Sequence, residues 1–274
     1  MLLSDFTDPG TARHALESLD TVTTKPLYFW DEDAEGQPEL KRLENHRLLF
    51  NATAREPVVP ATLIYAVLPH AEAFARILDA VEGMNLETMC YLEDLGNTAR
   101  LWLLFPDSWD EHPFVNVGIR ITNSYDMSVS LQGDLVLWSV PNDSAIVLSR
   151  TKDLGLPPLA LPHRAMAYEN LEERVRCYIE TARSETVRQA VDTEIERTAA
   201  IILRFQSDDE KTKLLREIFG KKLSARVATR MPETLSRWEF FRIVADVAHK
   251  EDLPPLMREI FRAKAEAFLC APSA

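Results

Sequence analysis

The densest group of basic side chains in this 274-residue chain lies between residues 211 and 230. Seven Lys and Arg residues stand there against one acidic residue, Glu217. Such tracks bind phosphate groups, and Lys222, Arg226 and Arg230 recur every four residues, which places them on one helix face. The pattern predicts a nucleic-acid-binding surface made of Lys211, Lys213, Arg216, Lys221, Lys222, Arg226 and Arg230. A solvated helix paired with acidic residues of this chain or a neighbour explains the same charges.

A second group is the polar turn 123–126, which stands between two apolar segments. Asn and Asp side chains in such turns accept hydrogen bonds from nearby backbone N–H groups, so a structural role explains them fully. The alternative is an unrecognised enzyme site around Asn123, Tyr125 and Asp126. Both interpretations remain open from spacing alone.

The remaining catalytic inventory is small. The sequence holds no glycine-rich phosphate loop, metalloprotease helix, nucleophile elbow or calcium loop. Its six His residues are scattered without metal-ligand spacing, so we expect no metal and no cofactor. The carboxylates at 31–35 could bind Mg²⁺ or act as acid and base, but the following Gly36 favours a solvated loop.

These residues need an α+β framework to position them. Residues 1–160 contain helix patterns at 9–19, with Asp8 as N-cap, and at 70–82, where apolar residues follow helical spacing. The stretch 39–50 shows a weak helix pattern. Alternating or β-branched segments predict strands at 27–30, 58–68, 86–93, 100–105, 114–122, 127–131, 135–140 and 145–148.

Residues 161–274 differ from this first part. After the Pro-rich connector around Pro157 and Pro162, helical spacing predicts helices at 165–183, 185–205, 209–219, 221–230, 234–249 and 254–269. Because strands and helices are segregated along the chain, we expect an α+β fold with a mostly antiparallel sheet and packed helices. The prediction is a sheet domain at 1–160 followed by an all-helical domain at 161–274.

Charge and composition bound the class of protein. A hydrophobic content of 46% excludes wholesale disorder. The net charge of −12 comes from the first part, because residues 1–163 hold 11 basic against 24 acidic residues, and residues 164–274 hold 20 against 19. Three distant Cys residues, no signal-peptide pattern and no apolar run of about 18 residues predict a cytoplasmic protein that does not enter a membrane.

The order of segments resembles a known family. Residues 65–74 show the pattern Y-x-V-x-x-H-x-E-A-F, followed by the apolar strand 100–105 and by the string 118–128. This order resembles a family of phage and plasmid proteins known as domain of unknown function nine-thirty-two, over about residues 57–185. Its N-S-[HY]-D-G-S signature and a later Asn are matched by Asn123, Ser124, Tyr125, Asp126, Ser128 and Asn142.

The match departs from the family in three places. Met127 stands where the family has Gly, the Cys two residues before Asn142 is missing, and His163 precedes Arg164 instead of following an Arg. The family resembles the single-strand annealing fold of Rad52-type recombination proteins. That resemblance implies a mobile-element protein that binds single-stranded DNA or RNA as a ring or filament, without nucleotide or metal, with Arg120 in the binding region.

Two other hypotheses stay beside nucleic-acid binding. The first is a homo-oligomeric structural or partner-binding protein, in which the acidic part of one subunit meets the basic helices of another. The second is an enzyme with an unrecognised site.

Overall fold

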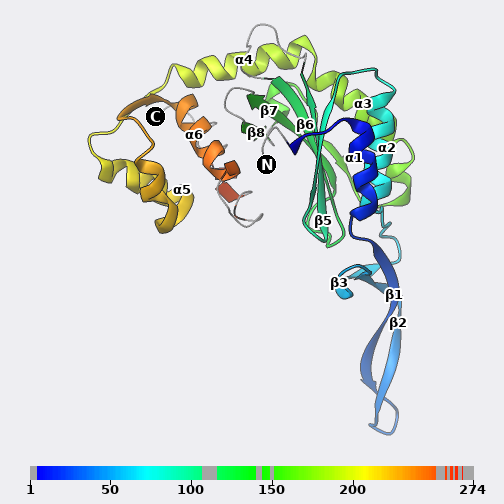
Figure 1. The fold of residues 1–274 in the computed structure, drawn as a ribbon. Coiled ribbons are helices and arrows are strands. Elements are labelled where there is room, and N and C mark those ends of the chain that lie inside the picture. Colours follow the sequence, from blue (N-terminus) through cyan, green and yellow to red (C-terminus); the bar gives the residue numbers. More distant parts are fainter. Residues whose placement is uncertain are drawn as a thin grey trace.

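The computed structural model describes residues 5–106, 116–139, 144–148 and 151–250, together with single positions between 257 and 267. An antiparallel six-stranded sheet forms its body (Figure 1). Five strands follow one another in space and in sequence, and a sixth, β9, pairs with β7. They are β4 (Met89–Asp94), β5 (Thr98–Phe105), β6 (Asn116–Ser124), β7 (Leu131–Ser139), β8 (Ser144–Leu148) and β9 (Leu159–Leu161). The predicted α+β class with an antiparallel sheet is confirmed.

Side chains of β5 alternate between two apolar clusters, one on each face of the sheet. Leu101 and Leu103 belong to the large core, whereas Trp102 and Leu104 belong to a smaller cluster with Trp138. The helices α1 (Pro9–Ala15), α2 (His70–Glu82) and α3 (Leu171–Ala182) lie together on one side of the sheet (Figure 1).

The helix predictions at 9–19 and 70–82 agree with α1 and α2. Asp8 caps α1, because its Oδ1 accepts the N–H of Thr11 at 3.0 Å. The apolar face of α2 is buried throughout, as its spacing predicts; it consists of Ala73, Phe74, Ile77, Leu78 and Val81.

A long β-arm projects from this body (Figure 1). It consists of β1 (Val22–Glu32) and β2 (Pro38–Asn51), with β3 (Glu56–Thr62) paired to β2 near the body. The weak helix pattern at 39–50 is therefore wrong. Most of this ribbon is open to solvent on both faces, so burial imposes no regular period on its sequence.

The C-terminal part is mainly helical but not entirely so. It holds α4 (Glu185–Ala199), α5 (Asp208–Ala228) and α6 (Arg237–Lys250), with a small antiparallel pair of β10 (Ile202–Arg204) and β11 (Thr234–Ser236). The helix predicted at 185–205 thus ends at Ala199, and the one predicted from 234 begins at Arg237. Gly220, with a φ of 71°, breaks α5 where the sequence predicts two helices.

The predicted division into two domains at residue 160 stays a prediction, and most of the helix predicted at 254–269 lies outside the described residues. Among the described residues, no helix combines the length and the apolar character needed to cross a membrane.

Candidate functional site

Two of the predicted nucleic-acid-binding cations are buried. Lys211 is 5% exposed, and its Nζ donates to Asp208 Oδ1 at 2.9 Å and to the carbonyl of Met231 at 3.2 Å. Arg120 is 4% exposed, and its Nη2 lies 2.6 Å from Asp134 Oδ2 inside the sheet. Neither side chain is presented to a phosphate backbone.

Other members of the basic track lie at the surface. Lys213, Arg216 and Lys221 on α5 and Arg230 after it are exposed, whereas the side chains of Lys222 and Arg226 lie outside the described part of the chain. The first turn of α5 contributes three exposed acidic residues, 208–210. The exposed surface of α5 therefore carries both signs of charge.

The first three residues of the N-S-Y-D motif, Asn123, Ser124 and Tyr125, are buried at the end of β6. Asn123 Nδ2 donates to the carbonyl of Leu68 and to Nδ1 of His70, both at 3.0 Å. Ser124 Oγ donates to the carbonyl of Val129 at 2.9 Å and accepts its N–H at 3.3 Å, which closes the loop after the strand.

Tyr125 connects three segments that are distant in sequence. Its hydroxyl accepts the N–H of His70 at 2.6 Å and donates to the carbonyl of Asp20 at 3.2 Å. Its ring also stacks on the His70 ring, with centroids 3.7 Å apart. These contacts hold the start of α2 and the segment before β1 against the end of β6.

The last residues of the motif shape a turn. Asp126 Oδ1 accepts the N–H of Ser128 at 3.0 Å. Met127 has a φ of 62°, a left-handed conformation that glycine adopts without strain. Asn142 lies outside the described residues.

Sequence reasoning missed Asn51, which completes this cluster. Its Nδ2 donates to Asp20 Oδ2 at 2.7 Å, and its Oδ1 accepts the backbone N–H groups of Thr53 and Ala54. A single Asn at a strand end gives no signal of its own. We call Asp20, Asn51, His70, Asn123 and Tyr125 the arm-root cluster, because together they join the β-arm to the sheet.

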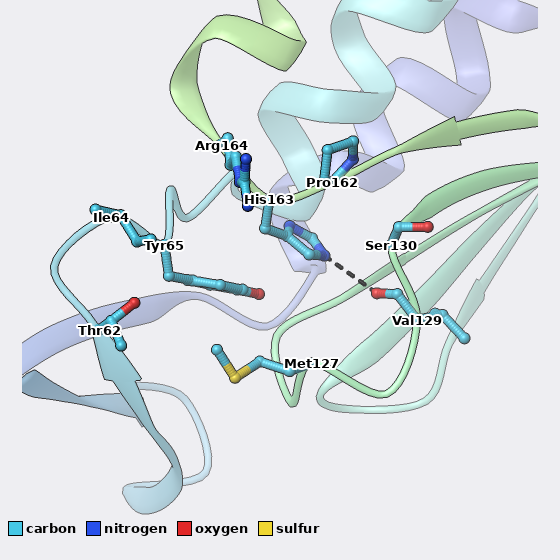
Figure 2. Close-up of a pocket in the computed structure, with 9 residues that line it drawn as sticks. All are labelled: Thr62, Ile64, Tyr65, Met127, Val129, Ser130, Pro162, His163 and Arg164. Atoms are coloured by element: carbon cyan, nitrogen blue, oxygen red, sulfur yellow. Dashed lines mark hydrogen bonds between the residues drawn. The ribbon is translucent and has the colours of Figure 1, made fainter.

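A pocket of about 270 Å³ opens beside this cluster, at the end of β3 (Figure 2). We call it the root pocket. Ring contacts and hydrogen bonds fix His163 at its floor: the ring lies 4.9 Å from that of Tyr65, Nε2 donates to the carbonyl of Val129, and Nδ1 accepts the hydroxyl of Tyr168. Its lining is Thr62, Ile64, Tyr65, Met127, Val129, Ser130, Pro162, His163 and Arg164.

Burial keeps the imidazole and phenol groups here in their neutral forms. It lowers the pKa of His70 to about 4 and lowers that of His163 as well. It raises the pKa of Tyr65 to about 12 and also raises that of Tyr125. A general acid or base works best with a pKa near the ambient pH, so these side chains are suited to packing and hydrogen bonding.

The acidic segment at 31–35 forms the tip of the β-arm. Lys41 Nζ lies 2.9 Å from Asp31 Oδ2, and this hydrogen bond lowers the pKa of Asp31. Asp33 Oδ1 accepts the N–H groups of Glu35 and Gln37, so it closes the turn between β1 and β2. Within the described ranges, no three His, Cys, Asp or Glu side chains are grouped as around a metal ion.

The fold and this site define an α+β protein with a projecting β-arm and a hydrogen-bonded arm root. Comparisons with protein-family models, with curated proteins and with solved structures find no match for the chain. The resemblance to the phage and plasmid family stays an expectation from the sequence.

Proposed function

We propose that this chain is a homo-oligomeric structural protein whose copies associate through the β-arm. The observation that supports this proposal most directly is an apolar face on the arm. Trp30 is 72% exposed, Leu40 52% and Tyr28 49%. Trp30 pairs with Leu40 and Tyr28 lies two residues earlier on the same strand, so all three side chains share one face.

The arm is poorly stabilised as an isolated element. A two-stranded ribbon is marginal in water, and within the described sheet β1 pairs only with β2, which leaves its outer edge open. Exposed aromatic patches mark interaction surfaces, and Trp and Tyr dominate binding energy at interfaces. Association would cover this face and give the arm further support.

A second copy fits this surface by charge. The arm tip at 31–39 contains five acidic residues and no basic one. Exposed basic residues lie elsewhere on the same chain, on α5 and at Arg164 beside the root pocket. The chain thus carries both halves of a complementary pair, which favours association between its own copies.

The test is the mass of the full chain in solution, measured by light scattering and analytical ultracentrifugation at micromolar concentration. We expect a multiple of 31.2 kDa and a large loss of association in Trp30→Ala. The matched control is Phe29→Ala, because Phe29 is also exposed but points to the opposite face of the ribbon. A wild-type monomer at these concentrations contradicts the proposal.

Nucleic-acid binding is the second candidate, and the exposed cations Lys213, Arg216 and Lys221 favour it. It predicts binding of single-stranded DNA or RNA that weakens steeply with salt. Fluorescence anisotropy at low salt would measure it, with charge reversal of these three residues compared with charge reversal of exposed Lys152. Absence of binding by the wild-type chain at low salt would exclude this candidate.

A further inference from the structure

The root pocket has the size and chemistry of a receptor for one large side chain. Its volume of about 270 Å³ lies below the roughly 300–1,000 Å³ of typical small-molecule sites. Ile64, 74% exposed, and Met127, 41% exposed, stand at its opening, and the Tyr65 and His163 rings lie inside (Figure 2). Methionine adapts its shape to an aromatic ring, so these walls suit an aromatic side chain.

The surroundings of the pocket extend the apolar surface and add a cation. Leu63 is 56% exposed and Met166 81% exposed, and each is close in sequence to a lining residue. Arg164 lines the pocket and is itself exposed. An aromatic residue next to carboxylates would therefore match both the apolar walls and the charge of this site.

The sequence Trp30-Asp31-Glu32 on the β-arm has this chemistry. Trp30 is the most exposed aromatic side chain of the described residues, and the two following residues are exposed acids. Thr62, which lines the pocket at the end of β3, lies opposite His46 of β2, and the adjacent Arg47 lies opposite Pro26 of β1. Trp30 is four residues beyond Pro26, which corresponds to about 13 Å at about 3.3 Å per residue. The arm projects away from the body (Figure 1), and Trp30 is not among the residues that line the root pocket of its own chain.

A two-fold axis between two copies can bring Trp30 of each copy to the root pocket of the other. When two arms lie side by side and run in opposite directions, the tip of each lies at the root of the other. One contact then occurs twice, as in any isologous dimer, and both copies contribute their arm and their pocket. The association is closed, since neither copy keeps an unoccupied arm or pocket.

We propose that the root pocket binds Trp30 of a second copy, with Glu32 of that copy, which shares the ribbon face of Trp30, beside Arg164, in a reciprocal dimer. This inference rests on the proposed self-association through the arm. It goes further by assigning the receptor site, its occupant and the symmetry of the assembly.

The experiment compares arm and pocket variants of the full chain by sedimentation equilibrium. Trp30→Ala in the arm and Ile64→Asp in the pocket should each weaken dimerisation by about 30-fold or more, as hot-spot residues do. The matched control for the pocket is Ile202→Asp, because Ile202 is an equally apolar residue, 51% exposed, at the start of β10. We expect this control to associate like the wild type.

A charge exchange separates a specific contact from general damage. Arg164→Glu and Glu32→Arg should each weaken the dimer, and the chain that carries both substitutions should regain most of the lost affinity. Circular dichroism spectra that match the wild type would show that the variants fold.

The outcomes distinguish the two proposals. A monomeric wild type overturns both. If Trp30→Ala disrupts the dimer but Ile64→Asp and Arg164→Glu do not, self-association through the arm stands. The assignment of the root pocket as the receptor is then overturned. A dimer insensitive to Trp30→Ala overturns both the arm contact and the pocket assignment.

Discussion

Acidification should destabilise the protein through His70, a side chain with 0% exposure in the arm-root cluster. Its Nδ1 must be unprotonated to accept the hydrogen bond from Asn123 Nδ2 at 3.0 Å. Burial is the main cause that lowers the pKa of His70 from 6.5 to about 4. His163 acts in the same direction, whereas the Gly96 backbone, Asp20 and Asp126 oppose the shift more weakly.

The sign and size of the effect follow from proton linkage. Below about pH 6.5 the unfolded chain binds a proton at His70, but the folded chain does not until about pH 4. The free energy of unfolding therefore falls as the pH drops through this window, and the stabilisation is fully present above it. Each unit by which the pKa of His70 differs between the unfolded and folded states is worth about 1.4 kcal/mol. The free energy of unfolding should therefore fall by about 3 kcal/mol through His70 alone.

Urea denaturation near neutral pH and near pH 4 measures this loss in the wild type and in His70→Gln. Gln cannot titrate but can still accept from Asn123, so the variant should lose about 3 kcal/mol less than the wild type over the same interval. An NMR titration of the His70 ring tests the same point without a variant. An imidazole that titrates near pH 6.5 in the folded protein would refute the reasoning.

Three further substitutions test other parts of the structure by chemical denaturation. Arg120→Ala should lower the free energy of unfolding by about 3–5 kcal/mol, because it leaves Asp134 buried without its 2.6 Å partner. Substituting both residues by apolar ones should restore most of the lost stability. A single variant as stable as the wild type would contradict the burial of this pair. Gly118→Ala should cost about 1–3 kcal/mol or more, since its Cβ would lie 2.5 Å from a carbonyl oxygen of β5; unchanged stability would mean that β5 and β6 are further apart. Tyr125→Phe should cost about 1–3 kcal/mol, because it removes a buried hydrogen bond with His70 and a part-buried one with Asp20. Tyr28→Phe on the exposed arm should change the stability little. Equal effects would argue against the arm-root role of Tyr125.

Elements with a strong local signal could be predicted from the sequence. The apolar spacing from Ala73 to Val81 predicts α2, and Asp8 before Pro9 predicts the start of α1. The signal for α2 is reliable because this helix buries one face, and burial imposes the helical period. The signal for α1 is its N-cap, which depends only on neighbouring residues. The arm shows the opposite case: most of β2 packs on no core, so its sequence carries no period and predicts the wrong element.

The candidate site was predictable only as a turn. Asx-turn chemistry correctly indicates that Asp126 accepts a backbone N–H. The partners of Asn123 and Tyr125 could not be predicted, because Leu68, His70 and Asp20 are 53 to 105 residues away. Hydrogen bonds over such separations depend on how the sheet, α2 and the arm root pack, and no local pattern encodes that packing.

The α+β class, the amphipathic helices and the uneven distribution of charge can be read from the amino-acid sequence alone. These properties depend on composition and on neighbours within a few turns of chain. Which side chains meet solvent depends on the tertiary structure. Lys211 and Arg120 are buried in ion pairs with Asp208 and Asp134, whereas the apolar side chain of Trp30 is exposed. The reason is physical, because a side chain's burial depends on segments brought together in space, and a sequence pattern reports only its own segment.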